Sequence, residues 1–361
     1  MPSAKTLKLA SFNIRFGGPE RPAESRNFDQ ERAWYERRDG LVDQVIWEEP
    51  DIIGFQEVLD NQLHDLAYLL GPSYIHVGVG RDDGKTAGEA VPIFWRKDRF
   101  KLLSVQYFWL SDKPEVVGSI GWDAGQTRMA TLAHFAPLTK DDHHPKLESD
   151  DTDTEAKASH PSSAINKQSE SFFVLNTHYD DRGTLARKRS SELIVSKLNQ
   201  LMADKGPDGA YDKLVVALGD LNSPASEDGY QVLTGHRYVN NRLAYTPTQL
   251  PMVQSTPITF LDSRHALFRR KSTDITSSIP FSKSLVLSAS FGEHSTYTGF
   301  STGSRTTLID YILLADNGVI QRDECDSAPW RVAKYGVIPN HFGDGVWVSD
   351  HRMVVVTLRR N

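Results

Sequence analysis

The sequence predicts a protein of the α/β class, and two patterns support this prediction. Short runs of aliphatic and β-branched residues, such as 214–218, end abruptly at glycine, acid or amide residues, which is typical of strands buried on both faces. Between such runs, segments such as 34–49 and 187–203 carry apolar residues at helical spacing. The chain of 361 residues is long enough for one large domain or two ordinary ones.

The N-terminal part is predicted to contain two strands and two helices. The predicted elements are a strand at 7–14, a helix at 34–49, a short buried strand at 51–57 and a helix around 63–70. The apolar helix faces are expected to consist of Leu41, Val42, Val45 and Ile46 in the first helix and Leu63, Leu66 and Leu70 in the second. Pro50 and Gly71 end these helices. The strands finish close to polar side chains, Asn13 and Glu57.

The middle of the chain continues with strands and one polar segment. Segments 75–80, 90–96 and 100–110 are predicted to form an antiparallel meander, and 129–135 forms a further strand. Residues 139–170 are rich in Asp, His, Ser, Lys and Glu, and we interpret them as a solvated insertion, ordered or disordered. We interpret the histidines of this insertion as surface residues and not as a metal site. They are His143, His144 and His160.

The C-terminal part is predicted to alternate strands with one long helix and a loop-rich region. The predicted elements are a strand at 172–178, a helix at 187–203, a strand at 214–218, and two last strands at 307–314 and 353–358. Residues 223–296 are expected to be rich in loops because Ser, Thr and Pro are scattered through much of this region. The basic run 187–189 is compatible with an edge that binds phosphates or with a solvated helix face.

Composition and charge exclude several classes of protein. Hydrophobic content of 39% and charged content of 24% are normal for a soluble globular protein, and no apolar run approaches membrane-spanning length. Residues 1–10 lack the apolar core of a secretory signal, and the single cysteine, Cys325, excludes an internal disulfide and a thiolate metal cluster. We therefore expect a cytoplasmic location, with a nuclear one as the alternative. The net charge of -6 argues against a surface that attracts nucleic acid everywhere, although it allows a local basic groove.

Polar side chains suited to metal or proton chemistry recur at the strand ends. They are Asn13, Glu57, His178, Asp220, Asn222, Asp310, Asp350 and His351. One such residue is ordinary turn chemistry, but packed sheets with these ends together would form one cluster of carboxylates, amides and imidazoles. Oxygen ligands without cysteine favour Mg²⁺, with Mn²⁺ as an alternative, over structural zinc. The sequence therefore predicts a divalent-metal site.

The residues around these strand ends resemble the pattern of the endonuclease/exonuclease/phosphatase superfamily. The matching motifs are, in order, 11–13 (Ser-Phe-Asn), 56–57 (Gln-Glu), 176–178 (Asn-Thr-His), 219–222 (Gly-Asp-Leu-Asn), 309–311 (Ile-Asp-Tyr) and 349–351 (Ser-Asp-His). Segments 79–84, 94–100 and 297–300 are similar to one microbial branch of that superfamily. The resemblance covers nearly the whole chain. It implies that residues 1–361 form a single domain, a four-layer sandwich of two packed mixed β-sheets flanked by helices.

The resemblance also implies a division of roles between metal ligands and the catalytic base. Glu57 is implied as the principal metal ligand, with Asn13 close by and the remaining carboxylates, Asp350 and Asp220, able to hold a second ion. Asp220, held by Asn222, is implied to activate the attacking water. A metal that neutralises phosphate charge and a carboxylate that supplies the base are what hydrolysis of a phosphate ester needs.

Two histidines and an arginine are implied to contact the phosphate group. His351, paired with Asp310 or supported by Asp350, is implied to stabilise or protonate the phosphate oxygens, and His178 to contact the phosphoryl group from the other side. Glu89 stands where a glutamate partner of His178 is expected. Arg128 is expected to bind substrate phosphate through a bidentate fork, a geometry for which arginine is well suited.

The expected function is therefore hydrolysis of a phosphodiester or phosphomonoester by an activated water. A nuclease acting on DNA or RNA by the same chemistry is the alternative. A non-catalytic scaffold is the alternative from another class, and its signature would be loss of the base or the metal acid, whereas Asp220 and Glu57 are both present. The expected partner is a phosphate-ester substrate, namely a small molecule, a lipid head group or a nucleic acid. No integral membrane segment and no obligate protein partner are expected.

Overall fold

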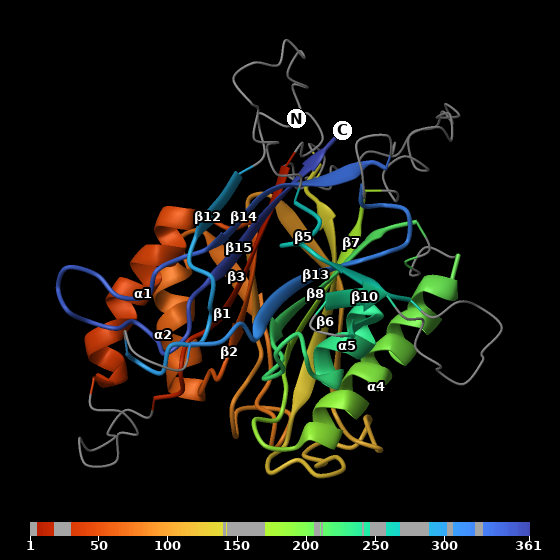
Figure 1. Ribbon diagram of the computed structural model, residues 1–361. Coiled ribbons are helices and arrows are strands. Elements are labelled where there is room, and N and C mark those ends of the chain that lie inside the picture. Colours follow the sequence, from red (N-terminus) through yellow and green to blue (C-terminus); the bar gives the residue numbers. More distant parts are fainter. Residues whose placement is uncertain are drawn as a thin grey trace, which may run out of the picture.

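The computed structural model describes most of the chain (Figure 1). The described residues are 6–17, 30–139, 142, 170–205, 210, 212–239, 242–245, 258–267, 289–301, 306–321 and 328–361. Most of the predicted insertion at 139–170, with all of its histidines, lies outside these ranges. Within them, no helix is both long and apolar enough to cross a membrane.

Two large mixed sheets and four helices form the described part of the chain. The first sheet has the strand order β12-β14-β15-β1-β2-β4-β3. Its strands are β1 (Thr6–Asn13), β2 (Ile52–Gln56), β3 (Tyr74–Val77), β4 (Ile93–Arg96), β12 (Ala289–Gly292), β14 (Trp330–Val337) and β15 (Val354–Arg360). The second sheet has the order β11-β13-β8-β7-β6-β5. Its strands are β5 (Phe100–Trp109), β6 (Met129–Pro137), β7 (Phe172–His178), β8 (Leu214–Asp220), β11 (Phe260–Asp262) and β13 (Asp310–Ala315).

The helices and a small ribbon complete the set of elements. The helices are α1 (Trp34–Glu48), α2 (Asp60–Leu70), α4 (Thr184–Ala203) and α5 (Asp228–Thr234), and the ribbon pairs β9 (His236–Val239) with β10 (Arg242–Tyr245). In Figure 1, α1 and α2 cover the outer face of the first sheet, and α4 and α5 cover that of the second. The four layers are therefore helices, sheet, sheet and helices, which confirms the predicted α/β sandwich.

Three apolar cores separate these layers. Leu9 of β1 and Val216 of β8 belong to the core between the two sheets. Val215 of β8 and Ile194 of α4 belong to the core under the second pair of helices, and Leu41 of α1 belongs to the core under the first pair. Successive side chains of a strand point to opposite faces, so a strand between two cores needs apolar residues at every position. This requirement explains the continuous apolar runs in the sequence.

Strand pairing brings chemically active residues together at the ends of neighbouring strands in each sheet. Strands β7 and β8 are parallel, with His178 opposite Asp220. Strand β13 runs antiparallel to β8, with Asp310 also opposite Asp220. In the first sheet, β1 and β2 are parallel, and Asn13 lies opposite Gln56, the residue before Glu57. The register of each sheet therefore fixes which polar groups meet.

Some predicted elements differ from the structure. Segment 100–110 is a strand, but β5 pairs with β6 in the second sheet, because the chain crosses between sheets directly after β4. Strand β14 was not predicted, because the exposed Lys334 interrupts its apolar pattern. Ile46 is 53% exposed and does not belong to the apolar face of α1. The region 223–296, expected to be rich in loops, contains α5 and the short strands β9 to β12 in its described part.

Candidate active site

The candidate site lies at one end of the core between the two sheets, where polar side chains replace apolar ones. In β1, alternate side chains place Leu9 in that core and Asn13 at the end of the strand. The same alternation places His178 of β7, Asp220 of β8 and Asp310 of β13 on the inter-sheet side. Because the side-chain period of a strand is two, the pattern that buries the core also directs these polar groups toward one another.

Asp220 lies at the centre of the polar cluster and is 1% exposed. Its Oδ1 accepts a hydrogen bond from the backbone N–H of Asn222 (2.8 Å), and its Oδ2 accepts one from Nδ2 of Asn13 (2.9 Å). The Nε2 atoms of His178 and His351 both lie 3.6 Å from the same Oδ2. Burial raises the pKa of Asp220 to about 7. A carboxylate with such a pKa is suited to take up a proton near neutral pH.

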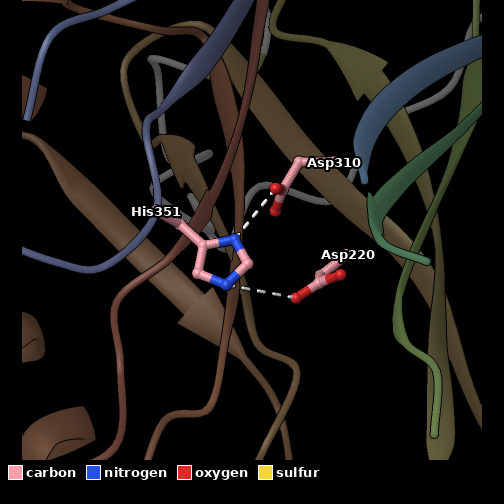
Figure 2. Close-up of side chains that lie close together, drawn as sticks. All are labelled: Asp220, Asp310 and His351. Carbon is pink, nitrogen blue, oxygen red and sulfur yellow. Dashed lines mark hydrogen bonds and ion pairs between the residues drawn. The ribbon is translucent and has the colours of Figure 1, made fainter. Parts of the chain in front are cut away.

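The two ring nitrogens of His351 face two different carboxylates, Asp310 and Asp220 (Figure 2). Nδ1 of His351 lies 2.9 Å from Oδ2 of the fully buried Asp310, and its Nε2 points toward Asp220. Burial by itself would lower the pKa of His351, but the charges of Asp310 and Asp220 raise it to about 10. The imidazole is therefore cationic at neutral pH. Of the two partners that the resemblance allows for His351, the structure places Asp310 in hydrogen-bond contact with it.

Three residues that line the site have a left-handed backbone. The φ angles are 59° at Arg15, 60° at Glu57 and 45° at Asn222. Each of these residues closely follows the end of a strand, namely β1, β2 or β8. Residues other than glycine rarely adopt this conformation, which costs on the order of 1–3 kcal/mol and concentrates at functional sites. The bends turn the chain at the strand ends where the polar cluster lies.

Glu57 occupies the first-sheet side of the site. Its Oε1 accepts a hydrogen bond from Nδ2 of Asn13 (3.0 Å), and its Oε2 accepts one from the backbone N–H of Phe16 (3.0 Å). Nη1 of Arg15 lies 3.9 Å from Oε2. Burial would raise the pKa of Glu57, but Arg15, His351 and these two hydrogen bonds lower it below its ordinary value. Glu57 is therefore ionised at neutral pH.

His178 belongs to the second-sheet side of the site. Arg128 donates a hydrogen bond from Nη1 to its Nδ1 (2.9 Å), and Nδ2 of Asn222 lies 3.0 Å from its Nε2. Glu89, the expected partner, lies 3.8 Å from Nδ1 and is closer to Arg81, at 2.7 Å. Burial, together with the charges of Arg128 and Arg81, holds the pKa of His178 well below its ordinary value. His178 is therefore neutral while His351 is charged.

A cleft of about 490 Å³ opens over these groups. The predicted site residues on its wall are Glu57, Glu89, Arg128, His178, Asp220, Asn222, Asp350 and His351. The two other predicted residues lie behind the wall, Asn13 against Asp220 and Asp310 against His351. The structure thus brings the whole predicted set together. The volume is typical of pockets that hold small molecules.

Two arginines on the wall of the cleft, Arg15 and Arg187, are absent from the predicted set. Arg15 forms an ion pair with Glu31, with Nε 3.2 Å from Oε1, and stands near Glu57. Its position two residues after the motif at 11–13 is the signal that could have found it. Arg187, at the start of α4, also lines the cleft and forms an ion pair with Glu227 at 2.8 Å. In the sequence, Arg187 belongs to the basic run 187–189, and nothing distinguishes it there from its two neighbours.

Several described residues offer ligand atoms that a divalent metal ion could bind. Asp220, Asp310 and His351 offer ligand atoms within 4.8 Å of one another. Within this group, Nδ1 of His351 and Oδ2 of Asp310 are already engaged with each other at 2.9 Å. Glu57 is ionised and reaches the cleft, and Asp350, whose pKa burial raises, offers a second carboxylate on the same wall. This oxygen donor set fits Mg²⁺ or Mn²⁺.

Asn13 makes a different contribution in this arrangement. Its amide nitrogen donates to Glu57 and Asp220, and its Oδ1 accepts a hydrogen bond from the backbone N–H of Arg15 (3.0 Å). The amide therefore links the two carboxylates across the interface between the sheets. In these contacts Asn13 orients the carboxylates, and its oxygen is already engaged.

Comparison with known proteins gives a consistent picture. The model of the Endonuclease/Exonuclease/phosphatase family matches residues 10–351. A structure of an endonuclease/exonuclease/phosphatase from Bacteroides vulgatus is 26% identical, with a TM-score of 0.64, and the match covers 99% of both chains. A search of curated proteins found no significant match.

Two further solved structures share the fold at lower identity. A mannosyl-6-phosphatase from Bacteroides thetaiotaomicron is 24% identical, with a TM-score of 0.65, over 98% of this chain and 99% of that one. The catalytic domain of human Nocturnin, solved with a bound sulfate anion, is 15% identical, with a TM-score of 0.54, over 99% of this chain and 95% of that one. These likenesses concern the fold alone.

Proposed function

Because this chain belongs to the endonuclease/exonuclease/phosphatase family, we propose that it hydrolyses a phosphate ester by water attack, with Asp220 as the base. The observation that carries this proposal is the position of Asp220, a buried carboxylate with a pKa of about 7 on the wall of the cleft. Two imidazoles of opposite protonation state flank its Oδ2. Such an arrangement can remove a proton on one side and supply positive charge on the other.

In the proposed reaction Asp220 takes one proton from water as the water oxygen attacks phosphorus. The P–O bond to the alcohol breaks, and the alkoxide receives a proton from the imidazolium of His351. The proton held by Asp220 then returns to His351, whose Nε2 lies 3.6 Å from Oδ2. Asp310 keeps the ring oriented throughout through its hydrogen bond to Nδ1. Neutral His178 and Asn222 provide hydrogen bonds to the phosphate oxygens from the other side of the cleft.

The proposed metal sites use the carboxylates on the wall of the cleft. Glu57 is the principal ligand, Asp350 and Asp220 supply further oxygens, and Asn13 links Glu57 to Asp220 through its amide nitrogen. A bound divalent ion in this family of reactions neutralises phosphate charge and helps to acidify water. Arg128, on the same wall, is proposed to bind a phosphate oxygen, and Glu89 to keep Arg128 and His178 in place.

The charges on the wall favour a small phosphate ester over a nucleic acid. Every described arginine that lines the cleft already faces a carboxylate: Arg15 faces Glu31, Arg128 faces Asp181 and Arg187 faces Glu227. A nucleic acid needs several uncompensated cations along its backbone. The mannosyl-6-phosphatase from B. thetaiotaomicron, which shares the fold, is in accord with a small substrate. We therefore place the phosphatase ahead of the nuclease, and the presence of Glu57 and Asp220 argues against a non-catalytic scaffold.

We further propose that residues 1–361 form a single domain. In support, β1 and β15, from the two ends of the chain, pair with each other, and the family model spans residues 10–351. The cytoplasmic location and the independence from protein partners stay predictions.

A panel of substrates tests the proposed function. An aryl phosphomonoester, an aryl phosphodiester, plasmid DNA and RNA are incubated with the protein in Mg²⁺, in Mn²⁺ and in EDTA. We expect turnover of the aryl esters that requires the metal and disappears in Asp220→Asn. Inactivity on all four substrates in both metals would favour the scaffold, and fragmentation of DNA or RNA faster than ester turnover would favour the nuclease.

A further inference from the structure

The ion pair of Arg187 and Glu227 lies on the wall of the cleft and has no part in the proposed reaction. Arg187 belongs to the first turns of α4, and Glu227 directly precedes α5. Nε and Nη2 of Arg187 donate to Oε2 of Glu227 at 3.1 and 2.8 Å, and Nη1 donates to the backbone carbonyl of Asp180 at 3.1 Å. Arg187 is 5% exposed, whereas the Glu227 side chain is 39% exposed.

The rest of the basic run does not share this position. Lys188 pairs with Asp228 at 3.3 Å and Arg189 pairs with Glu192 at 2.8 Å, and none of these four residues lines the cleft. The run therefore does not form a basic edge for phosphates. Of the three basic residues, only Arg187 lines the cleft, and its partner Glu227 lines the cleft beside it.

The Arg187–Glu227 pair has both hydrogen-bond donors and a hydrogen-bond acceptor available for a ligand. Its three hydrogen bonds use three of the five N–H groups of the Arg187 guanidinium, so two donors remain. Both contacts with Glu227 fall on Oε2, and Oε1 has no hydrogen bond to any residue that the structure describes. A donor and a charged acceptor thus stand side by side at the cleft.

A hydroxyl group matches this combination, and a phosphate does not. A hydroxyl both donates and accepts, so it can donate to Oε1 of Glu227 and accept from Arg187 at the same time. A phosphate oxygen only accepts, and the Glu227 carboxylate would repel its charge. Two adjacent hydroxyls could use both remaining N–H groups and the open carboxylate oxygen together.

We propose that the Arg187–Glu227 pair recognises the alcohol part of the substrate, and that this alcohol is polyhydroxylated, as in a sugar or cyclitol monophosphate. This inference rests on the proposed function, because it assigns the leaving group of that reaction. The wall that holds Glu57, Asp220 and His351 takes the phosphate, and the pair takes the hydroxyls. Asp181, which lines the same cleft with its side chain 43% exposed, offers a further acceptor.

The test compares substrates that share the phosphate group and differ in the alcohol. We compare kcat/KM for a hexose monophosphate with kcat/KM for para-nitrophenyl phosphate and take the ratio of the two values. The ratio is measured in Mg²⁺ for the native protein and for Glu227→Gln. Loss of hydrogen bonds to a charged group predicts that this ratio falls roughly 10- to 100-fold, mainly through KM of the hexose ester. The Glu227→Asp variant keeps the charge and should recover part of the ratio. Asp228→Asn, the neighbouring acid outside the cleft, is the matched control and should leave the ratio unchanged.

The remaining outcomes separate this inference from the proposed function. A myo-inositol monophosphate arm distinguishes a cyclitol from a sugar. The inference would be overturned if Glu227→Gln lowered kcat/KM equally for the polyol phosphate and for para-nitrophenyl phosphate. It would also be overturned if the native protein hydrolysed para-nitrophenyl phosphate but neither polyol phosphate. Both outcomes would leave the proposed hydrolase activity intact. Faster cleavage of an oligonucleotide than of the polyol esters would overturn the inference as well. Unchanged rates in Asp220→Asn would instead refute the proposed reaction.

Discussion

Replacing Asp220 by asparagine should abolish turnover and stabilise the fold at the same time. The substitution preserves size and removes the charge of a residue that is 1% exposed. Loss of a general base costs on the order of 10²–10⁴ in rate, so we expect kcat to fall at least about 100-fold. The fold should gain stability because burial disfavours the ionised carboxylate, and asparagine resembles the protonated form.

The size of the gain follows from the two pKa values of Asp220. The ordinary pKa of an aspartate is about 3.8, and in the folded protein burial raises that of Asp220 to about 7. Each pH unit of difference corresponds to about 1.4 kcal/mol, which gives an upper bound of roughly 4 kcal/mol above pH 7. Asn13 and Asn222 both donate to Asp220, whereas asparagine has one acceptor oxygen, so one donor loses its partner at a cost of about 1–3 kcal/mol. A net gain of about 1–3 kcal/mol remains.

The pH dependence gives this prediction its sharpest check. Because the folded pKa lies above the unfolded one, the native chain loses stability as the pH rises from about 4 to about 7. Urea denaturation in EDTA should therefore find equal or lower stability for Asp220→Asn at pH 4 and greater stability at pH 8. A variant that is less stable than the native protein at pH 8, or that retains turnover in Mg²⁺, would contradict the role assigned to Asp220.

Three further predictions test other parts of the structure. Glu57→Gln should weaken Mn²⁺ binding by at least about 100-fold in a calorimetric titration, because it removes the principal ligand, and an equal affinity would exclude Glu57 from the metal site. Arg37→Met should lower the free energy of unfolding by about 3–5 kcal/mol in urea, because it leaves three buried backbone carbonyls without their donor; a loss below about 1 kcal/mol would refute this. Gly219→Ala should cost about 3 kcal/mol or more, since φ is +143° and a Cβ would stand 2.0 Å from the Thr177 carbonyl oxygen. Gly318→Ala, where φ is also positive but the space is open, should cost only about 1 kcal/mol, and equal losses at the two glycines would contradict the steric argument.

The strands that were predicted most closely are those with a core on both faces. Strand β7 has the predicted bounds 172–178, because its side chains are buried at every position and the run is continuous. Strand β14 is buried at most positions, but Lys334 in its middle is exposed and hides the pattern. The sequence also could not tell which sheet β5 joins. That choice depends on packing between the sheets, and local periodicity does not encode it.

The sequence predicted which residues gather at the site, but it did not predict which of them contact one another. Polar residues at the ends of buried strands converge because the sheets pack with those ends together. Asn222 was expected to hold Asp220, but its backbone N–H makes that contact and its side chain points to His178. Likewise, Arg128 rather than Glu89 is in hydrogen-bond contact with His178. Such contacts depend on side-chain rotamers and on left-handed bends, which spacing along the chain does not determine.

The strand register at Asp220 has a consequence for how the protein should lose activity on heating. His178 and Asp310 face Asp220 from the two neighbouring strands, and these pairings belong to the central ladder of the second sheet. Central strands open only with the whole fold, whereas loops and strand edges open locally at lower cost. The geometry of the base should therefore persist until the sheet itself melts. Asp220, His178 and Asp310 should lose their relative positions only at the temperature at which the protein unfolds globally.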